Sequence, residues 1–351
     1  NPPSTCYESN GACQNGACTY TPKLTSGYTR LADHVAVKGA YRLALSSPFD
    51  VWMVGASDNH IGRWNGCSYS TCTGLPSYIN DPNAACWPDS SGNAARLRGI
   101  ASTSPGRFIA VGDKGTVARS GGSCFTVEYV PNVPGGSAPV HLKSVWAASE
   151  SLAFAVGEEG CTGKTWLLRR TDTGWTYFPA SAIPAGVSIY RVTGRGPNEV
   201  YAWGADNNTN TAVILAYDGS LWGRLVIPSV YSINAVHAPV GRTEIYAAGY
   251  EAQIDTPVLL IWRNNSWERW DKANGRLPST MKSLGGVYSP AANDVFVSSA
   301  AWYQVYRHNG VSWSTHTSSI NTVAYNDLAG SGSWVFLLQG TTAAGGLWRG
   351  P

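Results

Sequence analysis

The residues best suited to chemistry are polar side chains that come one position after the leading apolar residue of seven strand-like segments. The leading residues are Tyr41, Leu97, Leu142, Tyr190, Ile233, Met281 and Ile320. Five of the residues that follow are cationic and two are amides: Arg42, Arg98, Lys143, Arg191, Asn234, Lys282 and Asn321. Cations gathered around one cavity would concentrate an anionic group, such as a uronate, sulfate or phosphate. The opposing interpretation is that they only line a water-filled channel, solvated or paired with carboxylates.

A second set of candidates lies in polar segments between the expected strands: Asp58, His60, Glu158, Glu159, Asp206, Glu251 and Asp255. A glycoside hydrolase needs two carboxylates at a defined separation, and several pairs here qualify, so none is singled out. In a polysaccharide lyase, Arg98 or Arg191 would neutralise a uronate, and His60 or Tyr303 would be the base. The simpler interpretation of each carboxylate is a solvated loop charge.

Metal ligands and nucleophile motifs are sparse. Oxygen donors cluster at residues 206–208, "DNN", without the spacing of an EF-hand loop, so calcium is an alternative only there. The sequence has no Cys-X-X-Cys pair with a matching His spacing and no G-x-S-x-G motif. We therefore expect no cofactor, and the motifs do not decide whether the protein is an enzyme.

An apolar anchor of five residues recurs seven times: "VWMVG" at 51, "FIAVG" at 108, "AFAVG" at 153, "VYAWG" at 200, "IYAAG" at 245, "VFVSS" at 295 and "WVFLL" at 334. The period is about 45 residues, and each unit contains four strand-like segments, which is the size of a propeller blade. The sequence therefore predicts an all-β, seven-bladed β-propeller of four-stranded antiparallel blades. Aromatic residues near the start of the fourth strands are expected to pack between blades: Tyr69, Phe125, Trp175, Trp222, Trp267 and Trp313.

Ring closure follows from where the last unit ends. The seventh unit stops at residues 346–351, which read as a third strand, so one edge needs a partner. Residues 28–37, "YTRLADHVAV", are strand-like and are predicted to be the outer strand of the seventh blade. We expect a propeller over residues 28–351 and a cysteine-rich head over residues 1–27, which is too short to bury its own core.

Residues 46–66, "SSPFDVWMVGASDNHIGRWNG", carry a family resemblance. They resemble the repeat SPxDVWAVGxxGxIxRWxGxxW of exported bacterial β-propellers, and residues 195–204 and 289–298 resemble it more weakly. Residues 111–122, "VGDKGTVARSGG", are similar to Asp-box and photosystem-assembly-factor propellers but lack a complete S-x-D-x-G-x-T-W motif. The resemblance covers residues 41–351 and implies a binding scaffold; a propeller fold alone assigns no activity.

Charge and cysteine content bear on partners and location. A net charge of +3 with dispersed Lys and Arg argues against a nucleic-acid partner. The sequence has eight cysteines, and three of them lie within residues 6–18. This content favours disulfides and an oxidising compartment. The sequence starts with Asn1 and has no apolar run of 18 residues, so we expect secretion after signal-peptide removal and no transmembrane segment.

The expected strand order also constrains the disulfides. Cys124 begins a fourth strand, whereas Cys161 lies in a loop at the opposite end of the blade. A strand of six residues spans about 20 Å, and bridged Cα atoms lie within about 7 Å, so the two are not expected to pair. Cys86 is the expected partner of Cys161, and Cys67 or Cys124 is the expected anchor of the head.

Three functions remain as hypotheses. The first is an extracellular binding propeller that recognises a glycan or anionic polymer at the channel mouth and on the face of the long, variable loops. The second is a polysaccharide lyase or glycoside hydrolase on the same face. The third is a cell-surface platform for protein partners.

Overall fold

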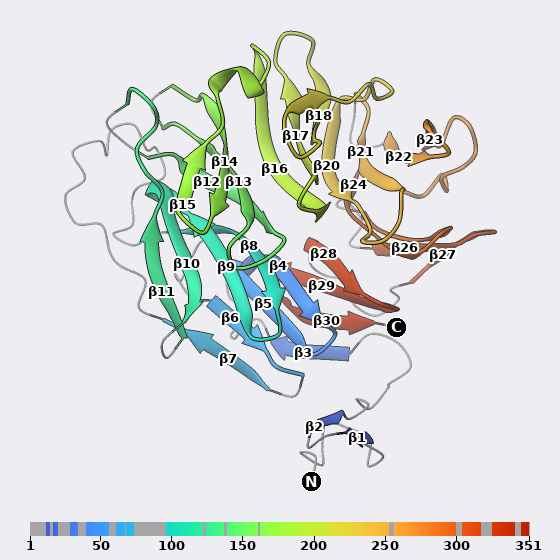
Figure 1. Ribbon diagram of the computed structural model, residues 1–351. Coiled ribbons are helices and arrows are strands. Elements are labelled where there is room, and N and C mark those ends of the chain that lie inside the picture. Colours follow the sequence, from blue (N-terminus) through green and yellow to red (C-terminus); the bar gives the residue numbers. More distant parts are fainter. Residues whose placement is uncertain are drawn as a thin grey trace.

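A computed structural model of the chain describes residues 12–14, 17–19, 29–33, 40–55, 61–66, 68–73, 96–121, 124–136, 139–160, 162–252, 256–299, 304–316, 325–340 and 345–350 (Figure 1). Within these ranges, helix is limited to two 3-10 turns, η2 (Asp113–Gly115) and η3 (Ala180–Ala182). No helix among the described residues is long and apolar enough to span a membrane.

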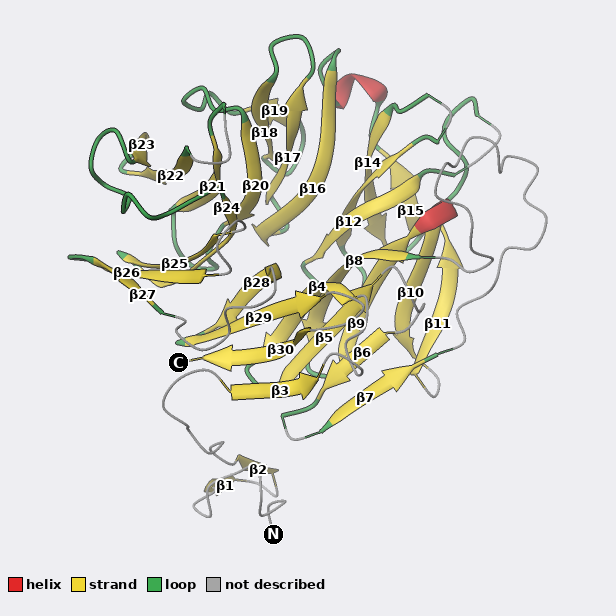
Figure 2. Cartoon of the chain, turned by 180° about the vertical axis from the view of Figure 1, so that it is seen from behind, coloured by secondary structure: helices red, strands yellow, loops and turns green. Residues whose placement is uncertain are grey.

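Seven four-stranded antiparallel sheets form a ring, and the first strands of the blades surround its centre (Figures 1 and 2). Blade 1 contains β4 (Ala40–Ser47), β5 (Asp50–Gly55), β6 (Ile61–Trp64) and β7 (Tyr69–Cys72). Blade 2 contains β8 (Leu97–Ser104), β9 (Arg107–Gly112), β10 (Thr116–Gly121) and β11 (Cys124–Tyr129). Blade 3 contains β12 (His141–Ala147), β13 (Ala153–Glu158), β14 (Thr165–Thr171) and β15 (Gly174–Tyr177).

The remaining blades follow the same order. Blade 4 contains β16 (Val187–Gly196), β17 (Glu199–Asp206), β18 (Thr211–Tyr217) and β19 (Trp222–Arg224). Blade 5 contains β20 (Ser232–His237), β21 (Ile245–Tyr250), β22 (Pro257–Arg263) and β23 (Ser266–Asp271). Blade 6 contains β24 (Leu284–Ala291), β25 (Asp294–Ser299), β26 (Gln304–Asn309) and β27 (Trp313–Thr315). Blade 7 contains β28 (Tyr325–Ser331), β29 (Trp334–Gly340), β30 (Gly345–Gly350) and, from the N-terminal side, β3 (Thr29–Asp33).

The predicted fold is confirmed, including the way in which the ring closes. Strand β3 pairs antiparallel with β30, in a register that sets Arg30 opposite Trp348 and Ala32 opposite Leu347. This pairing covers the edge that the seventh blade would otherwise expose. In the predicted head, the described residues form a hairpin of β1 (Ala12–Gln14) and β2 (Ala17–Thr19), outside the ring in both ribbon views.

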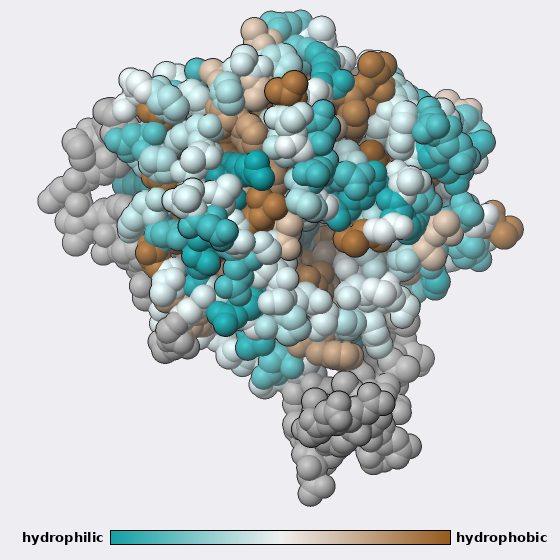
Figure 3. Space-filling view, in the orientation of Figure 1, coloured by the Kyte–Doolittle hydropathy of each residue, from teal (hydrophilic) through white to brown (hydrophobic). Residues whose placement is uncertain are grey.

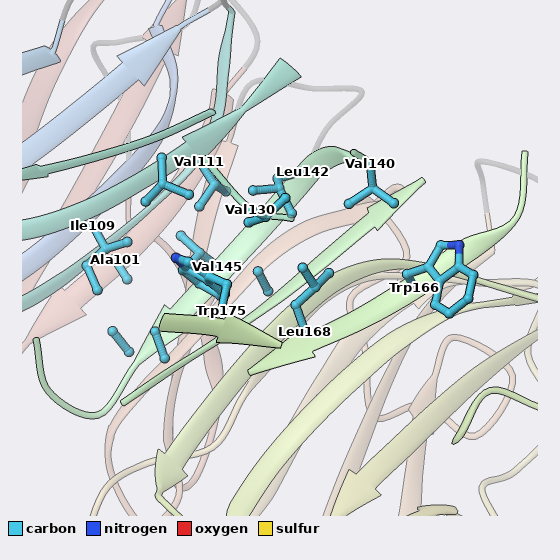
Figure 4. Close-up of a cluster of buried hydrophobic side chains, with 14 of the residues drawn as sticks. Ala101, Ile109, Val111, Val130, Val140, Leu142, Val145, Trp166, Leu168 and Trp175 are labelled. Atoms are coloured by element: carbon cyan, nitrogen blue, oxygen red, sulfur yellow. The ribbon is translucent and has the colours of Figure 1, made fainter. Parts of the chain in front are cut away.

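Each anchor is the second strand of its blade and is buried on both faces. In β9, Phe108 and Ala110 pack toward blade 1, whereas Ile109 and Val111 pack toward blade 3. Because successive side chains of a strand point to opposite faces, a strand between two blades needs apolar residues at every position. Figure 4 shows one interface, with side chains of blades 2 and 3 directed toward each other.

Aromatic residues of the fourth strands do pack between blades. Trp175 lies in the interface of blades 2 and 3, and its indole N–H donates to Glu128 Oε1 of blade 2 at 3.0 Å. Trp222 of blade 4 packs against Phe154 of blade 3, with ring centroids 6.3 Å apart. These rings therefore belong to the scaffold.

The carboxylate of Asp50 explains the most regular part of the repeat. Asp50 is 3% exposed and accepts hydrogen bonds from Arg63 Nε at 2.8 Å and from Trp52 Nε1 at 3.1 Å. It also accepts one from the backbone N–H of Gly106 in blade 2 at 2.9 Å. In blade 1, the D-V-W and R-W residues thus hold the carboxylate that ties this blade to blade 2.

One disulfide joins the outer strands of blades 1 and 2, from Cys72 of β7 to Cys124 of β11, with Cα atoms 6.0 Å apart. The expectation that Cys124 does not pair with Cys161 is confirmed. The suggestion that Cys124 anchors the head is wrong, because its sulfur is bonded to Cys72. Cys67, Cys86 and Cys161 lie outside the described residues.

His237 of β20 is the most perturbed histidine of the described chain. Its ring lies 5.1 Å from that of Tyr288 in blade 6, and its Nε2 is buried without a hydrogen-bond partner. Burial lowers the pKa of His237 from 6.5 to about 4. The folded protein therefore holds this ring neutral at pH values where the unfolded chain protonates it.

This shift predicts an acid sensitivity that the substitution His237→Phe reduces. Because the unfolded state binds the proton first, the free energy of unfolding falls as the pH drops from about 6.5 to about 4, by about 3 kcal/mol from this residue. Urea unfolding at a series of pH values tests it. His141 and His308 also have lowered pKa values and contribute to the acid sensitivity of both proteins. The prediction therefore concerns the difference between the wild type and the variant. Parallel curves for the wild type and the variant would contradict it.

Candidate functional site

A pocket of ≈ 360 Å³ opens where the first strands of blades 1 to 5 begin, and it brings together five of the predicted site residues. The surface dips over the centre of the ring, in a face that is largely polar (Figure 3). The pocket is lined by Tyr41, Arg42, Arg98, Lys143, Tyr190, Arg191, Trp203, Ser232, Ile233 and Asn234. Lys282 precedes β24 and is not part of this lining. His60, Tyr303 and Asn321 lie outside the described residues.

A β-bulge near the start of each first strand positions these side chains. In every blade the ladder between the first and second strands skips one residue at this point. The skipped residues are Tyr41, Arg98, Lys143, Tyr190, Asn234, Gly285 and Asn326. The extra residue re-aims its neighbours and bends the strand.

The bulges show that the cationic residues aligned in the sequence do not occupy equivalent positions in their strands. Arg98 and Lys143 are skipped residues, whereas Arg42 and Arg191 come one position later in the ladder. The seven residues are therefore not equivalent. The apolar pattern misleads because Tyr41 and Tyr190 resemble leading residues but are themselves the skipped ones.

The glycine that ends five of the seven anchors is a sequence signal for the bulge. A Cβ added to Gly204 would lie 1.8 Å from Ser188 O, and one added to Gly249 would lie 1.9 Å from Ser232 O. A Cβ added to Gly112 would lie 2.0 Å from Arg96 O, and one added to Gly157 would lie 2.8 Å from His141 O. Only glycine allows the backbone of the bulged strand to cross at this distance.

Two of the mouth cations are neutralised by carboxylates. Arg98 Nε donates to Asp113 Oδ1 at 2.5 Å, and His141 Nδ1 contacts the same oxygen at 2.9 Å. Burial alone would raise the pKa of Asp113, but these hydrogen bonds outweigh it and lower the pKa. Lys143 forms an ion pair with Glu158. For these two positions the structural interpretation, pairing with nearby carboxylates, is supported.

Arg191 differs from these cations. Among the described residues, no carboxylate lies within ion-pair distance of its guanidinium and no hydrogen bond from it is present. It lines the channel. Burial, with a smaller contribution from the charge of Arg42, lowers the pKa of Arg191 to about 10, and the charge of Asp327 opposes the shift. The group remains protonated at neutral pH and has no counter-ion from the described chain.

Other polar groups at the mouth join neighbouring first strands. Tyr41 donates its hydroxyl proton to Leu97 O at 3.2 Å, and Asn234 Nδ2 donates to Leu284 O at 2.7 Å. Other such links are Val192 N to Ser144 Oγ at 3.2 Å and Leu43 N to Asp327 Oδ2 at 3.0 Å. Asn234, predicted as a ligand-binding residue, thus has a structural contact as well.

Catalytic groups are not assembled in the described part of this site. His141 and Asp113 form an acid–histidine pair, but His141 Nε2 is buried from solvent and cannot reach a ligand. The described loop carboxylates are engaged: Glu251 pairs with Arg269, and Asp206 pairs with Arg224 at 2.8 Å. Asp206 Oδ1 also accepts the Asn208 N–H at 3.0 Å, so protein donors occupy the suggested calcium position. The described residues include no group of three side chains that could hold a metal ion.

Comparison with known proteins shows the fold. No family model and no curated protein matches the chain. A streptogramin B lyase structure is similar, with a TM-score of 0.61 and 11% identity over 92% of this chain and 96% of that one. YCF48 from Cyanidioschyzon merolae has a TM-score of 0.61 and 12% identity over 92% and 98% of the two chains. YCF48 bound to a D1 peptide has a TM-score of 0.57 and 12% identity over 92% and 95%. At these identities the likeness establishes a β-propeller and no activity.

The bulge predicts that Gly204→Ala is strongly destabilising. The added Cβ would overlap the carbonyl oxygen of Ser188, which is backbone and cannot rotate away. We expect a loss of about 3 kcal/mol or more in the free energy of unfolding, measured by chemical denaturation. Gly223→Ala in the same blade is the matched control, because its Cβ would meet nothing within 4 Å and should cost less than about 0.5 kcal/mol. Equal stability of the two variants would contradict the bulged register.

Proposed function

We propose that this protein is an extracellular binding propeller whose channel mouth takes the anionic group of a glycan or other anionic polymer. The observation that carries the proposal is the protonated guanidinium of Arg191, which lacks a counter-ion among the described residues. A partly buried charge without a partner is costly, so an incoming anion gains more here than at a solvated surface cation. Arg42, which lines the same pocket, adds a second positive charge that would attract this anion.

Aromatic surfaces beside the pocket favour a sugar-bearing ligand. Tyr190 lines the pocket and is 42% exposed, with Lys143 Nζ 5.5 Å from its ring centroid. Tyr231, next to the pocket residue Ser232, is 49% exposed and lies against Tyr250, with centroids 5.7 Å apart. Exposed aromatic faces and a few polar groups are the usual makeup of a small-ligand site.

Two further observations support the proposed location and the binding role. The disulfide between Cys72 and Cys124 suits an oxidising compartment and hence secretion. The YCF48 structure with its D1 peptide demonstrates that a propeller of similar fold holds a chain-like ligand.

Replacement of Arg191 tests the proposal. Binding of polygalacturonate, dextran sulfate and neutral dextran would be measured by isothermal titration calorimetry at two salt concentrations. We expect the anionic polymers to bind more weakly at high salt, and Arg191→Gln to weaken them by about tenfold or more. Arg195→Gln, in the same strand and ion-paired with Glu199 far from the pocket, is the matched control and should bind like the wild type.

Two results would overturn the proposal. The first is tightest binding to the neutral polymer, and the second is anionic binding that Arg191→Gln leaves unchanged. Protein binding without affinity for any of the polymers would favour the platform for protein partners instead.

A further inference from the structure

We infer that the mouth recognises the end of a glycan chain, by inserting one terminal uronate carboxylate toward Arg191, rather than binding anionic groups along the chain. This inference rests on the proposed function and specifies its ligand. It depends on the depth of Arg191, on the charge that remains uncompensated there, and on the size of the pocket.

Arg191 lies at the bottom of the mouth pocket. Together with Arg42 and Trp203, it lines both this pocket and a second cavity of ≈ 310 Å³ that continues down the channel. In the ladder it is one residue farther along its strand than the bulged positions of Arg98 and Lys143, which corresponds to about 3 Å. An anion that only touches the rim therefore meets Arg98 and Lys143, which already have carboxylate partners.

The charge at this depth suits a single monoanion. Arg98 is balanced by Asp113, and Lys143 is balanced by Glu158. Arg42 and Arg191 line the lower cavity together with Asp327, so two positive charges and one negative charge leave one net positive charge there. One net positive charge matches one carboxylate better than a dianionic phosphate or a cluster of sulfates. A guanidinium can also hold the two oxygens of a carboxylate side by side.

The walls favour a chain end over a chain middle. Trp203 and Ile233 are 5% and 6% exposed and close two sides of the pocket, and its ≈ 360 Å³ lies at the small end of the range for ligand sites, about 300–1,000 Å³. An internal uronate has a sugar on each side, so both neighbours would have to descend with it. A terminal residue has only one neighbour, which can lie over the exposed ring of Tyr190.

Three probes test end recognition by calorimetry: a xylo-oligosaccharide carrying one terminal glucuronate, its methyl ester, and long polygalacturonate. We expect the free acid to bind at least about tenfold more tightly than the ester, because esterification removes the charge that Arg191 pairs with. Arg191→Gln should abolish this preference, whereas Arg195→Gln should keep it. The polygalacturonate should bind one protein per chain end, so its stoichiometry per chain should not rise with chain length.

The outcomes separate the two levels of the proposal. Several proteins per polygalacturonate chain, with binding still lost in Arg191→Gln, would overturn end recognition and keep the anionic-polymer function. If neither the uronate probes nor dextran sulfate show binding that depends on Arg191, both levels are overturned. Tighter binding of a short peptide with a free C-terminal carboxylate, lost when that terminus is amidated, would replace the glycan end by a peptide end.

Discussion

The first strand of every blade has an edge that faces the channel and has no strand beside it. The backbone N–H and C=O groups on that edge need hydrogen-bond partners other than a neighbouring strand, such as water or side chains. Side chains near the mouth supply several of the missing contacts, as when Asn234 donates to Leu284 O and Asp327 accepts from Leu43 N. Much of the polarity of this channel is therefore structural, because it adds hydrogen bonds between the first strands of neighbouring blades.

The bulges determine which side chains line the proposed site. A ladder that skips one residue determines which side chain each blade brings to the mouth, and in blade 4 Gly204 at the end of the anchor leaves room for the backbone of the bulged strand. Blades 2 and 3 place cations there together with the carboxylates that neutralise them. Blade 4 places Tyr190 at the rim and Arg191 beneath it, and the described chain supplies no counter-ion to that guanidinium. This difference between blade 4 and blades 2 and 3 is the basis for proposing a ligand site rather than a channel that only holds water.

Much of the fold can be predicted from the sequence because it depends on local patterns. The anchors are apolar at every position since they are buried between two blades, and residues 28–37 are the available strand for the unpaired edge. The site could be predicted only in part. Its location near the start of the first strands follows from the repeat. The repeat does not show that Arg98 and Lys143 are the skipped residues of their bulges, whereas Arg42 and Arg191 come one position later. The contact of His141 with Asp113 and the bond between Cys72 and Cys124 join neighbouring blades, and no periodic pattern encodes such contacts.

The central proposal is that Arg191 is the cation at the mouth that binds the anionic group of the ligand. Its most direct test is to follow the arginine Nε–H signals in two-dimensional NMR spectra while sodium glucuronate is added. The account predicts a saturable shift of the Arg191 signal, which grows sharper and more protected as the guanidinium gains a partner, and little change at Arg98, which is already bound to Asp113. A glucuronate titration that shifts the Arg98 signal and leaves that of Arg191 in place would contradict it.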